Sequence, residues 1–375
     1  MAAWIGRSEA LARLGVRAQT LYAYVSRSRI GVRPDPSDPR RSLYSVEDIE
    51  ALASRRRRGR SAQAIAESAF SWGEAAIPTE ISTIAHGRLV YRGRDAVALS
   101  DMASLEGTAS LLWDTAAPIA LVVPTDTPMG AYAALAALVD DAPATIGRSA
   151  AAQHRDGAIS VGQLAAGFGL PRSDSPLHAR LAARWRLEGT GAELLRRALV
   201  LMADHELNAS TFAVRVAAST GAPIAACLLA GLATLSGPRH GGAGAALGML
   251  VDHAERLGVG EALSQWLGLG LPVPGFGHLL YPEGDIRACA LLAHLPRDSL
   301  LAALADAVAA ATGALPNIDF ALAALQRHLA LPSDAPFVLF ALGRSIGWVA
   351  HAVEQATCGT LIRPRARYEG LTETV

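Results

Sequence analysis

The stretch Gly237-Pro-Arg-His-Gly-Gly-Ala243 sets the interpretation of this chain, because it places an imidazole at a break between two apolar segments. The glycine–proline pair interrupts one helix, and the alanine-rich segment after it favours another helix over 243–257. The positive end of that helix disfavours an imidazolium, so His240 should be neutral. A neutral imidazole can donate a hydrogen bond to an enol or enolate. Gly241 and Gly242 should allow a ligand to approach the backbone closely.

Three further polar residues stand in similarly marked motifs. His205 lies in Asp204-His-Glu-Leu-Asn-Ala-Ser210, His278 in Pro274-Gly-Phe-Gly-His278, and Asp319 in Pro316-Asn-Ile-Asp319. We expect His205 to open a helix in which Asn208 is one turn further on. Asp319 should begin another helix, where a carboxylate is stabilised and well placed as a base. One carboxylate with several imidazoles can make and trap a carbanion without a metal, each such group contributing on the order of 10²–10⁴-fold.

Arginines near these motifs indicate the substrate class. Arg287, Arg344 and Arg363 lie near these motifs in the sequence. Guanidinium forks bind carboxylates bidentately. Several of them around one site predict a substrate with two or three carboxylates.

The composition predicts a mainly α-helical protein. The 375 residues are enough for two or three domains, and they are 51% hydrophobic but only 5% aromatic. A hairpin is expected over 81–91, around His86-Gly87. Helices are expected at 131–139, 191–203, 243–257, 300–312 and 343–358.

Several other classes of site are not favoured by the sequence. Gly241-Gly-Ala-Gly244 follows a loop and not a strand, so it fails the test for a dinucleotide site. The three cysteines are widely spaced, and no residues have the spacing of metal ligands, so no metal site is expected. The uncharged stretch 216–238 contains Pro223 and ends in a glycine–proline break, so we interpret it as a buried helix or subunit interface and not as a membrane span. The N-terminus lacks the pattern of a signal peptide, and a cytoplasmic protein is expected.

The N-terminal region differs in charge from the rest of the chain. Residues 1–60 hold 13 arginines against 6 acidic residues. A short helix from Ser8 is followed by a turn and a second helix over 17–26, then by the proline-rich basic segment 33–41. Ser45 with Asp48 has the pattern of a capping box for one more helix.

This order of elements resembles the winged helix-turn-helix head of the mercury-resistance-regulator (MerR) type, over about residues 4–55. Such a head can bind DNA, or can serve dimerisation or docking alone. The basic run 55–60 is either a solvated linker or a tail that contacts phosphates. The residues expected to face DNA are Arg17, Gln19, Thr20, Tyr22, Arg40 and Arg41.

From about residue 70 onward the chain resembles citrate synthase. The resemblance rests on motifs that follow one another in the order of that family. They are Tyr91-Arg-Gly93, Leu112-Trp113, His205-Glu-Leu-Asn-Ala-Ser-Thr211, Gly237-Pro-Arg-His-Gly-Gly-Ala243, Gly275-Phe-Gly-His278, Asp285-Ile-Arg287, Pro316-Asn-Ile-Asp-Phe320, Arg344-Ser-Ile-Gly-Trp-Val-Ala-His351 and Arg363-Pro-Arg-Ala-Arg-Tyr368.

The resemblance implies a role for each catalytic residue. Asp319 would take a methyl proton from acetyl-CoA while His240 stabilises the enol, and His278 would donate a proton to the carbonyl of oxaloacetate. Hydrolysis of the citryl thioester would then release CoA. Oxaloacetate or citrate would be held by His205, Arg287, Arg344 and Arg363, the last contributed across a homodimer. The adenine of CoA would lie against Leu271, Pro272, Val273, Pro274, Gly275, Phe276 and Gly277.

The implied architecture is an all-α homodimer or higher homo-oligomer, with a large and a small helical domain. We expect a helix-turn-helix domain over 1–58, a basic linker over 59–69 and the citrate synthase-like domain over 70–375, with its small subdomain at about 241–328. The partners would be acetyl-CoA, which is a substrate, and oxaloacetate. No separate cofactor and no membrane are expected.

Local departures from the family pattern leave alternatives open. Arg239 and Leu279 stand where the family commonly has an apolar residue and an arginine, Ile286 replaces a proline, and the usual Tyr-Ser-Gly after Asp319-Phe320 is missing. One alternative is a 2-methylcitrate synthase that uses propionyl-CoA, since one methylene is discriminated only modestly. The other is a DNA-binding regulator whose synthase-like body senses a metabolite.

Overall fold

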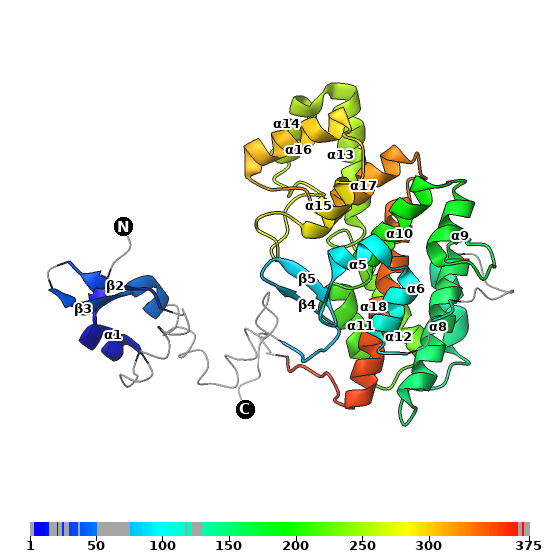
Figure 1. Ribbon diagram of the computed structural model, residues 1–375, viewed down its shortest axis with the longest axis horizontal. Coiled ribbons are helices and arrows are strands. Elements are labelled where there is room, and N and C mark those ends of the chain that lie inside the picture. The colour runs from blue at the N-terminus through cyan, green and yellow to red at the C-terminus, as the bar shows by residue number, and fades with distance from the viewer. Residues whose placement is uncertain are drawn as a thin grey trace. The chain divides into compact units, whose positions relative to one another are not determined.

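The chain forms two compact units, Met1–Pro78 with Arg363–Val375, and Thr79–Ile362 (Figure 1). They are treated separately below. The computed structural model describes residues 4–14, 21, 25, 30–36, 38–50, 76–116, 119–121, 130–366 and 370.

The first unit contains a small antiparallel sheet. Strand β3 (Asp38–Ser45) lies between β1 (Trp4–Gly6) and β2 (Val32–Asp35), with Ile5 opposite Tyr44 and Arg33 opposite Leu43. Helix α1 (Arg7–Leu14) packs on it around a core that includes Ala10, Leu14, Leu21, Ile30, Tyr44 and Ile49. The basic segment 33–41 therefore belongs to a strand pair.

The predicted cap after this sheet is present in altered form. Ser45 Oγ accepts a hydrogen bond from Asp48 N at 3.3 Å, and residues 46–50 are helical. The Asp48 carboxylate accepts from Gly31 N at 2.8 Å and thereby ties the helix to the strand pair.

Most of the residues expected to face DNA cannot be checked. Arg17, Gln19, Thr20, Tyr22 and the side chain of Arg40 lie outside the described residues. Arg41 is exposed and lies 3.3 Å from Asp38. The helix-turn-helix prediction therefore stays a prediction.

The second unit opens with the expected hairpin and continues as helices. β4 (Ser82–Ala85) pairs with β5 (Arg88–Tyr91), and β5 with β6 (Arg94–Asp95). The helices that follow are α5 (Ala96–Met102), α6 (Leu105–Leu112), α7 (Ala131–Val139), α8 (Ala150–Gly167), α9 (Leu177–Arg184), α10 (Thr190–Met202), α11 (Ala209–Ser219), α12 (Ile224–Leu235), α13 (Ala243–Leu257), α14 (Val259–Gly268), α15 (Ile286–Leu292), α16 (Ser299–Thr312), α17 (Ile318–His328) and α18 (Ala335–Cys358).

Helix α18 is the centre of the larger core. It packs against α8, α10, α11 and α12. The helix begins eight residues earlier than the predicted 343–358, because Gly343 is a packing position inside it and not a breaker. A Cβ on Gly343 would lie 2.6 Å from Met202 Cβ and 2.9 Å from Leu199 O, so glycine allows α18 and α10 to touch.

Within the described ranges, α18 alone is long and apolar enough to cross a membrane by length and composition, and 89% of its apolar window is buried inside the protein. A core helix passes the same test. The stretch 216–238 is not one helix, since Gly221, with φ +83°, separates α11 from α12.

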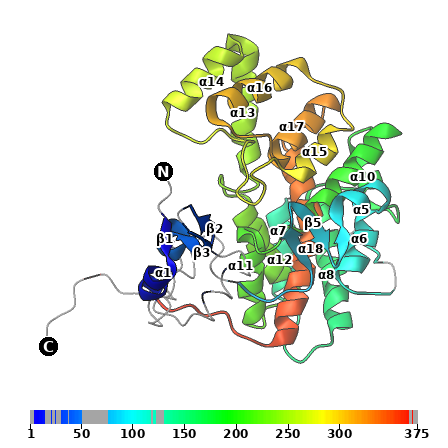
Figure 2. The same cartoon turned by 60° about the vertical axis from the view of Figure 1, so that its left-hand side comes forward.

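A second, smaller core lies among α13, α14, α16 and α17 (Figure 2). Helix α17 has one face in each core: Ile318, Leu322 and Leu325 belong to the larger, and Phe320 and Ala324 to the smaller. At about 100° per residue, Asp319 falls at the boundary between these two faces. The sequence thus places the expected base where the two cores meet.

Candidate active site

Two loops that carry expected catalytic residues are joined by backbone hydrogen bonds. Gly277 N donates to Leu315 O at 2.8 Å, and Asn317 N donates to Gly275 O at 2.9 Å. These bonds set the loop that ends in His278 alongside the loop that leads to Asp319. Gly275 has φ +82°, and a Cβ there would lie 2.7 Å from Leu247, so both its conformation and its packing require glycine.

The carboxyl group of Asp319 has the properties of a base. Burial raises its pKa to about 6, although Arg287 and Arg344 act in the opposite direction. Its side chain has no hydrogen-bond or ion-pair partner among the described residues, and its amide is capped by Asn317 Oδ1 at 3.0 Å. A carboxylate with a pKa close to neutral is matched to proton abstraction at physiological pH.

His240 lies just before α13, as predicted, and burial lowers its pKa to about 4. The positive charges of nearby Arg344 and Arg287 lower this pKa further. Burial and these charges therefore keep the ring neutral without a contribution from the helix dipole. The glycines after His240 are required by the chain's own packing. A Cβ on Gly241 would lie 2.8 Å from Leu235, and one on Gly242 would meet the carbonyl oxygen of Ser236.

The hydrogen-bond partners of His240 govern its tautomer. Its Nε2 lies 2.9 Å from Ser210 Oγ and 3.2 Å from Asn208 Oδ1. Ser210 Oγ accepts from Trp348 Nε1 at 3.2 Å, and lies 2.7 Å from Asn208 Oδ1. Its single hydrogen can go to Asn208 or to His240, and the second choice leaves the imidazole hydrogen on Nδ1, free to meet a ligand.

His205 and His278 form one cluster with Tyr281. The two imidazoles meet edge-on at 5.1 Å between centroids, and Tyr281 Oη lies 3.0 Å from His205 Nε2. His205 stands in a turn before α11 and does not open the helix, because Asn208 is the N-cap and accepts from Thr211 N at 3.2 Å.

Both imidazoles are neutral in this surrounding. Burial lowers the pKa of His278 to about 4 and that of His205 well below its usual range, with Arg287 contributing to both. His278 Nδ1 accepts from Leu280 N at 3.2 Å, so the neutral ring carries its hydrogen on Nε2.

The two buried arginines differ in their pairing. Arg287 makes a bidentate pair with Asp285, at 3.0 and 2.7 Å. Arg344 is 1% exposed and donates from Nε to Met202 O at 3.0 Å, but its buried Nη2 has no partner within the described part of the chain. Burial lowers the pKa of Arg344 to about 10, which still leaves it charged at neutral pH. A buried guanidinium nitrogen without a hydrogen-bond partner is costly, so this group is suited to receive the oxygen of an anion.

Arg363 and the segment 271–277, expected to contact CoA, are the remaining parts of the predicted site. Arg363 belongs to the other compact unit, so its part in the site stays a prediction. In the segment expected against CoA, Leu271 is 52% exposed, whereas Val273 and Phe276 are buried in the smaller core. A cavity of about 370 Å³ adjoins this segment and is lined by Gly277, His278, Leu279, Tyr281, Pro282, Asp285, Gly313, Ala314 and Leu315.

Several residues of the site were not predicted as functional. Ser210 and Tyr281 contact the imidazoles directly, and Asp285 holds Arg287. Asp285 is the first residue of the motif Asp285-Ile-Arg287, and Tyr281 follows His278 by three positions, so proximity in sequence was the available signal. No group of three or more His, Cys, Asp or Glu side chains suited to a metal ion occurs in the ranges the structure describes.

A mainly helical fold with neutral imidazoles, a base of raised pKa and a buried unpaired arginine defines an acid–base enzyme site for an anionic substrate. The family model "Citrate synthase, C-terminal domain" matches residues 132–365. The chain belongs to the citrate synthase family.

Individual relatives agree with this assignment. A citrate synthase of Haloferax volcanii is 38% identical over 191 residues, which cover 48% of this chain and 50% of that protein. A 2-methylcitrate synthase 1 of Corynebacterium glutamicum is 33% identical, over 47% of this chain and 49% of that one. The matches thus span about half the length of these curated relatives.

Solved structures confirm the fold over a longer stretch. A ternary complex of carboxymethyl coenzyme A and oxaloacetate with citrate synthase from Thermoplasma acidophilum aligns with a TM-score of 0.64 and 25% identity. The alignment covers 80% of this chain and 95% of that one. The predicted citrate synthase-like helical fold is therefore confirmed.

Proposed function

We propose that this protein condenses acetyl-CoA with oxaloacetate and water to give citrate and CoA. The observation that carries the proposal is the pairing of a base with an anion site. Asp319, whose pKa is raised to about 6, lies within electrostatic reach of the buried and unpaired Arg344. The Thermoplasma acidophilum relative, in complex with oxaloacetate and a CoA analogue, supports the choice of substrates.

The reaction combines proton transfer, the formation of one carbon–carbon bond and the hydrolysis of one thioester. The Asp319 carboxylate takes a proton from the methyl group of the thioester. His240, in the tautomer that carries its hydrogen on Nδ1, donates a hydrogen bond to the enol oxygen. The enol carbon attacks the ketone carbon of oxaloacetate, and His278 Nε2–H supplies the proton to the resulting alkoxide. Water then hydrolyses the citryl thioester, and CoA leaves as the thiol.

The acceptor is held by cations and a neutral imidazole. Arg344 offers its unpaired Nη2 to one carboxylate. The remaining polar groups of oxaloacetate are bound by Arg287, which is also paired with Asp285, and by His205, which is fixed by Tyr281. Arg363 would complete the site across a homodimer, and the segment 271–277 would receive the adenine of CoA.

A thiol-release assay with oxaloacetate tests the proposal. We expect turnover with acetyl-CoA and its loss in Asp319→Ala, whereas Arg256→Gln, on the surface of α13, should keep it. A wild-type protein that binds citrate but releases no thiol would overturn the proposal and favour the metabolite-sensing regulator.

A 2-methylcitrate synthase is the second candidate, supported by the Corynebacterium glutamicum relative. The same assay decides between the two acyl groups. A kcat/KM for propionyl-CoA above that for acetyl-CoA would assign the chain to 2-methylcitrate formation.

The N-terminal unit is proposed to be a MerR-type helix-turn-helix domain that binds DNA, in a protein located in the cytoplasm. Its support is the arginine excess of residues 1–60 and the strand pair that presents Arg41. Retention on DNA should be salt-sensitive and should weaken in the double variant Arg40→Ala, Arg41→Ala. Equal retention by a chain lacking residues 1–60 would dismiss this role.

A further inference from the structure

A second cavity, of about 660 Å³, lies against a face of α17 that does not include Asp319. Its lining on that helix includes Phe320, Ala324 and His328. His328 is about two and a half turns from Asp319, which places the two on opposite sides of the helix. The cavity is therefore separate from the candidate active site, and its volume is that of a ligand pocket.

The cavity lies where the two cores meet. Leu292 and Leu295 line it, and both pack against the larger and the smaller core. Phe320 and Leu301 add apolar surface from the smaller core. An apolar group of an occupant would thus be covered by side chains of both cores.

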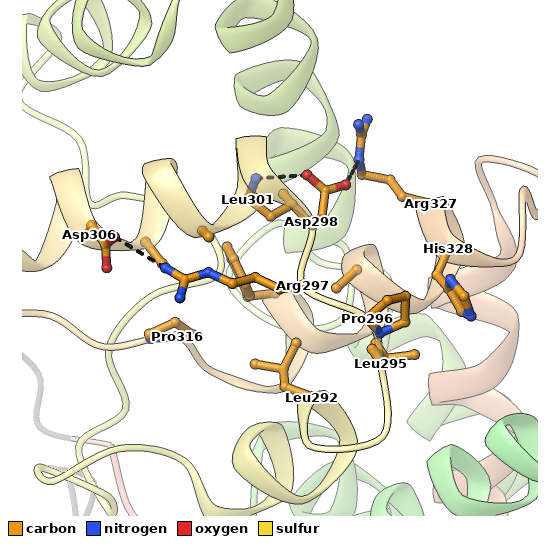
Figure 3. A pocket seen from close by; sticks show the side chains of 14 residues that line it. Leu292, Leu295, Pro296, Arg297, Asp298, Leu301, Asp306, Pro316, Arg327 and His328 are labelled. Atoms are coloured by element: carbon orange, nitrogen blue, oxygen red, sulfur yellow. Dashed lines mark hydrogen bonds and ion pairs between the residues drawn. The ribbon is translucent and has the colours of Figure 1, made fainter.

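Two charged groups of the rim, Asp298 and Arg327, are engaged with other groups of the protein (Figure 3). Asp298 caps α16 by accepting from Leu300 N at 2.9 Å and Leu301 N at 3.1 Å, and it pairs with Arg327 at 3.1 Å. Arg327 is also bonded to Glu255 at 2.7 Å. These groups form a neutralised wall with little capacity for a ligand.

The other charged pair at the rim is weakly held. Arg297 meets Asp306 at 3.8 Å, with both side chains about four-fifths exposed, at 80% and 79%. Such an exposed ion pair contributes little to stability, so another anion can replace Asp306 as the partner of Arg297. His328 has no hydrogen-bond partner in the part of the chain that the structure describes.

We propose that this cavity is a second ligand site, for a small amphipathic anion. The hydrocarbon part packs on Phe320, Leu292 and Leu295, and the carboxylate or similar group replaces Asp306 as the partner of Arg297. The guanidinium of Arg297 is then the group that favours an anion over a neutral molecule with the same apolar body.

Calorimetric titration of the full chain with octanoate, octanol and octylamine tests the site. We expect octanoate to bind most tightly, and Arg297→Gln to weaken it by about tenfold or more, the usual effect of losing a charge-assisted hydrogen bond. Ala324→Leu or Ala302→Leu should abolish binding of octanoate by filling the cavity, with unfolding temperatures measured to show that each variant is folded. Arg256→Gln is the matched control and should bind as the wild type does.

The titration also separates this cavity from the active site. Octanoate should still bind to Arg344→Gln, in which the buried arginine is gone. Loss of binding in Arg344→Gln with retention in Arg297→Gln would place the anion in the active site and overturn the proposal. Equal affinity for octanoate and octanol, or no binding at all, would overturn it as well.

Discussion

The imidazole of His205 meets the imidazole of His278 edge-on, with ring centroids 5.1 Å apart. Each ring is fixed by a separate partner, His205 by Tyr281 Oη at 3.0 Å and His278 by Leu280 N at 3.2 Å. Two neutral imidazoles with fixed orientations can serve one acceptor molecule from two directions, which a single histidine could not do.

Replacing the proposed base should make the protein more stable and inactive. The folded-state pKa of Asp319, about 6, lies above its usual 3.8, so its burial costs stability once the group ionises. Asp319→Asn should therefore raise the free energy of unfolding by on the order of 1–3 kcal/mol above pH 6. The gain should fade as pH drops toward 4. Urea unfolding at pH 5 and pH 8 measures this, and a variant less stable than the wild type at pH 8 would contradict it.

The raised pKa also predicts the pH dependence of activity. Only the ionised Asp319 can take a proton, so kcat/KM should fall about tenfold per pH unit below pH 6. Initial rates between pH 5 and pH 8 would show the fall. A profile that stays flat to pH 5 would mean that Asp319 is not the base.

Ser210 should affect catalysis through the tautomer of His240. Ser210→Ala removes the group 2.9 Å from His240 Nε2, and we expect kcat to fall by about 10²-fold with little change in KM for oxaloacetate. Ser219→Ala on the same helix is the control, since that hydroxyl bonds only Val216 O of its own helix. Equal rates for the two variants would show that Ser210 has no part in catalysis.

Arg344 should determine whether dicarboxylates and tricarboxylates stabilise the protein. Citrate binding to the folded state should raise the unfolding temperature of the wild type. The shift should vanish in Arg344→Gln, because the buried guanidinium nitrogen of the candidate site that lacks a partner among the described residues is lost. Arg256→Gln should retain the full shift. Differential scanning fluorimetry with and without citrate gives the comparison, and a normal shift in Arg344→Gln would remove Arg344 from the anion site.

The turn that carries His205 should depend on a hydrogen bond from the hairpin. Glu206 has φ +49°, an unfavourable value for this residue. Ser82 Oγ accepts from Glu206 N at 3.1 Å and donates to the buried carboxylate of Asp204. Ser82→Ala leaves Glu206 N without its partner and removes one of the two partners of Asp204 Oδ2, which keeps His351 Nε2 at 3.2 Å. The variant should cost about 1–3 kcal/mol in urea unfolding. Ser236→Ala, whose hydroxyl is exposed and bonds Ala233 O, should cost far less; equal losses would argue against this role.

Much of the helical pattern could be predicted from sequence, because apolar periodicity and capping residues are local signals. The bounds 131–139 and 243–257 agree with α7 and α13. The start of α18 was missed, since the role of Gly343 depends on Met202 and Leu199, which lie on another helix. The extent of a helix across an internal glycine is a property of packing that no local pattern contains.

The motif residues of the site were found because each stands at a break in structure. Their partners were harder to find. Tyr281 and Ser210 act through distances to imidazoles from other loops, and the difference between the paired Arg287 and the unpaired Arg344 exists only in three dimensions. Sequence could suggest which residues react, but not which of them are already neutralised by a neighbour.

Helix α17, with one face in each core, ties the strength of the base to the packing of the protein. Burial is what raises the pKa of Asp319, and that burial comes from two cores meeting at one helix. If water entered this junction, the carboxyl would revert to an ordinary weak base. The basicity of Asp319 therefore depends on the contact between the two cores, and it is lost when they separate.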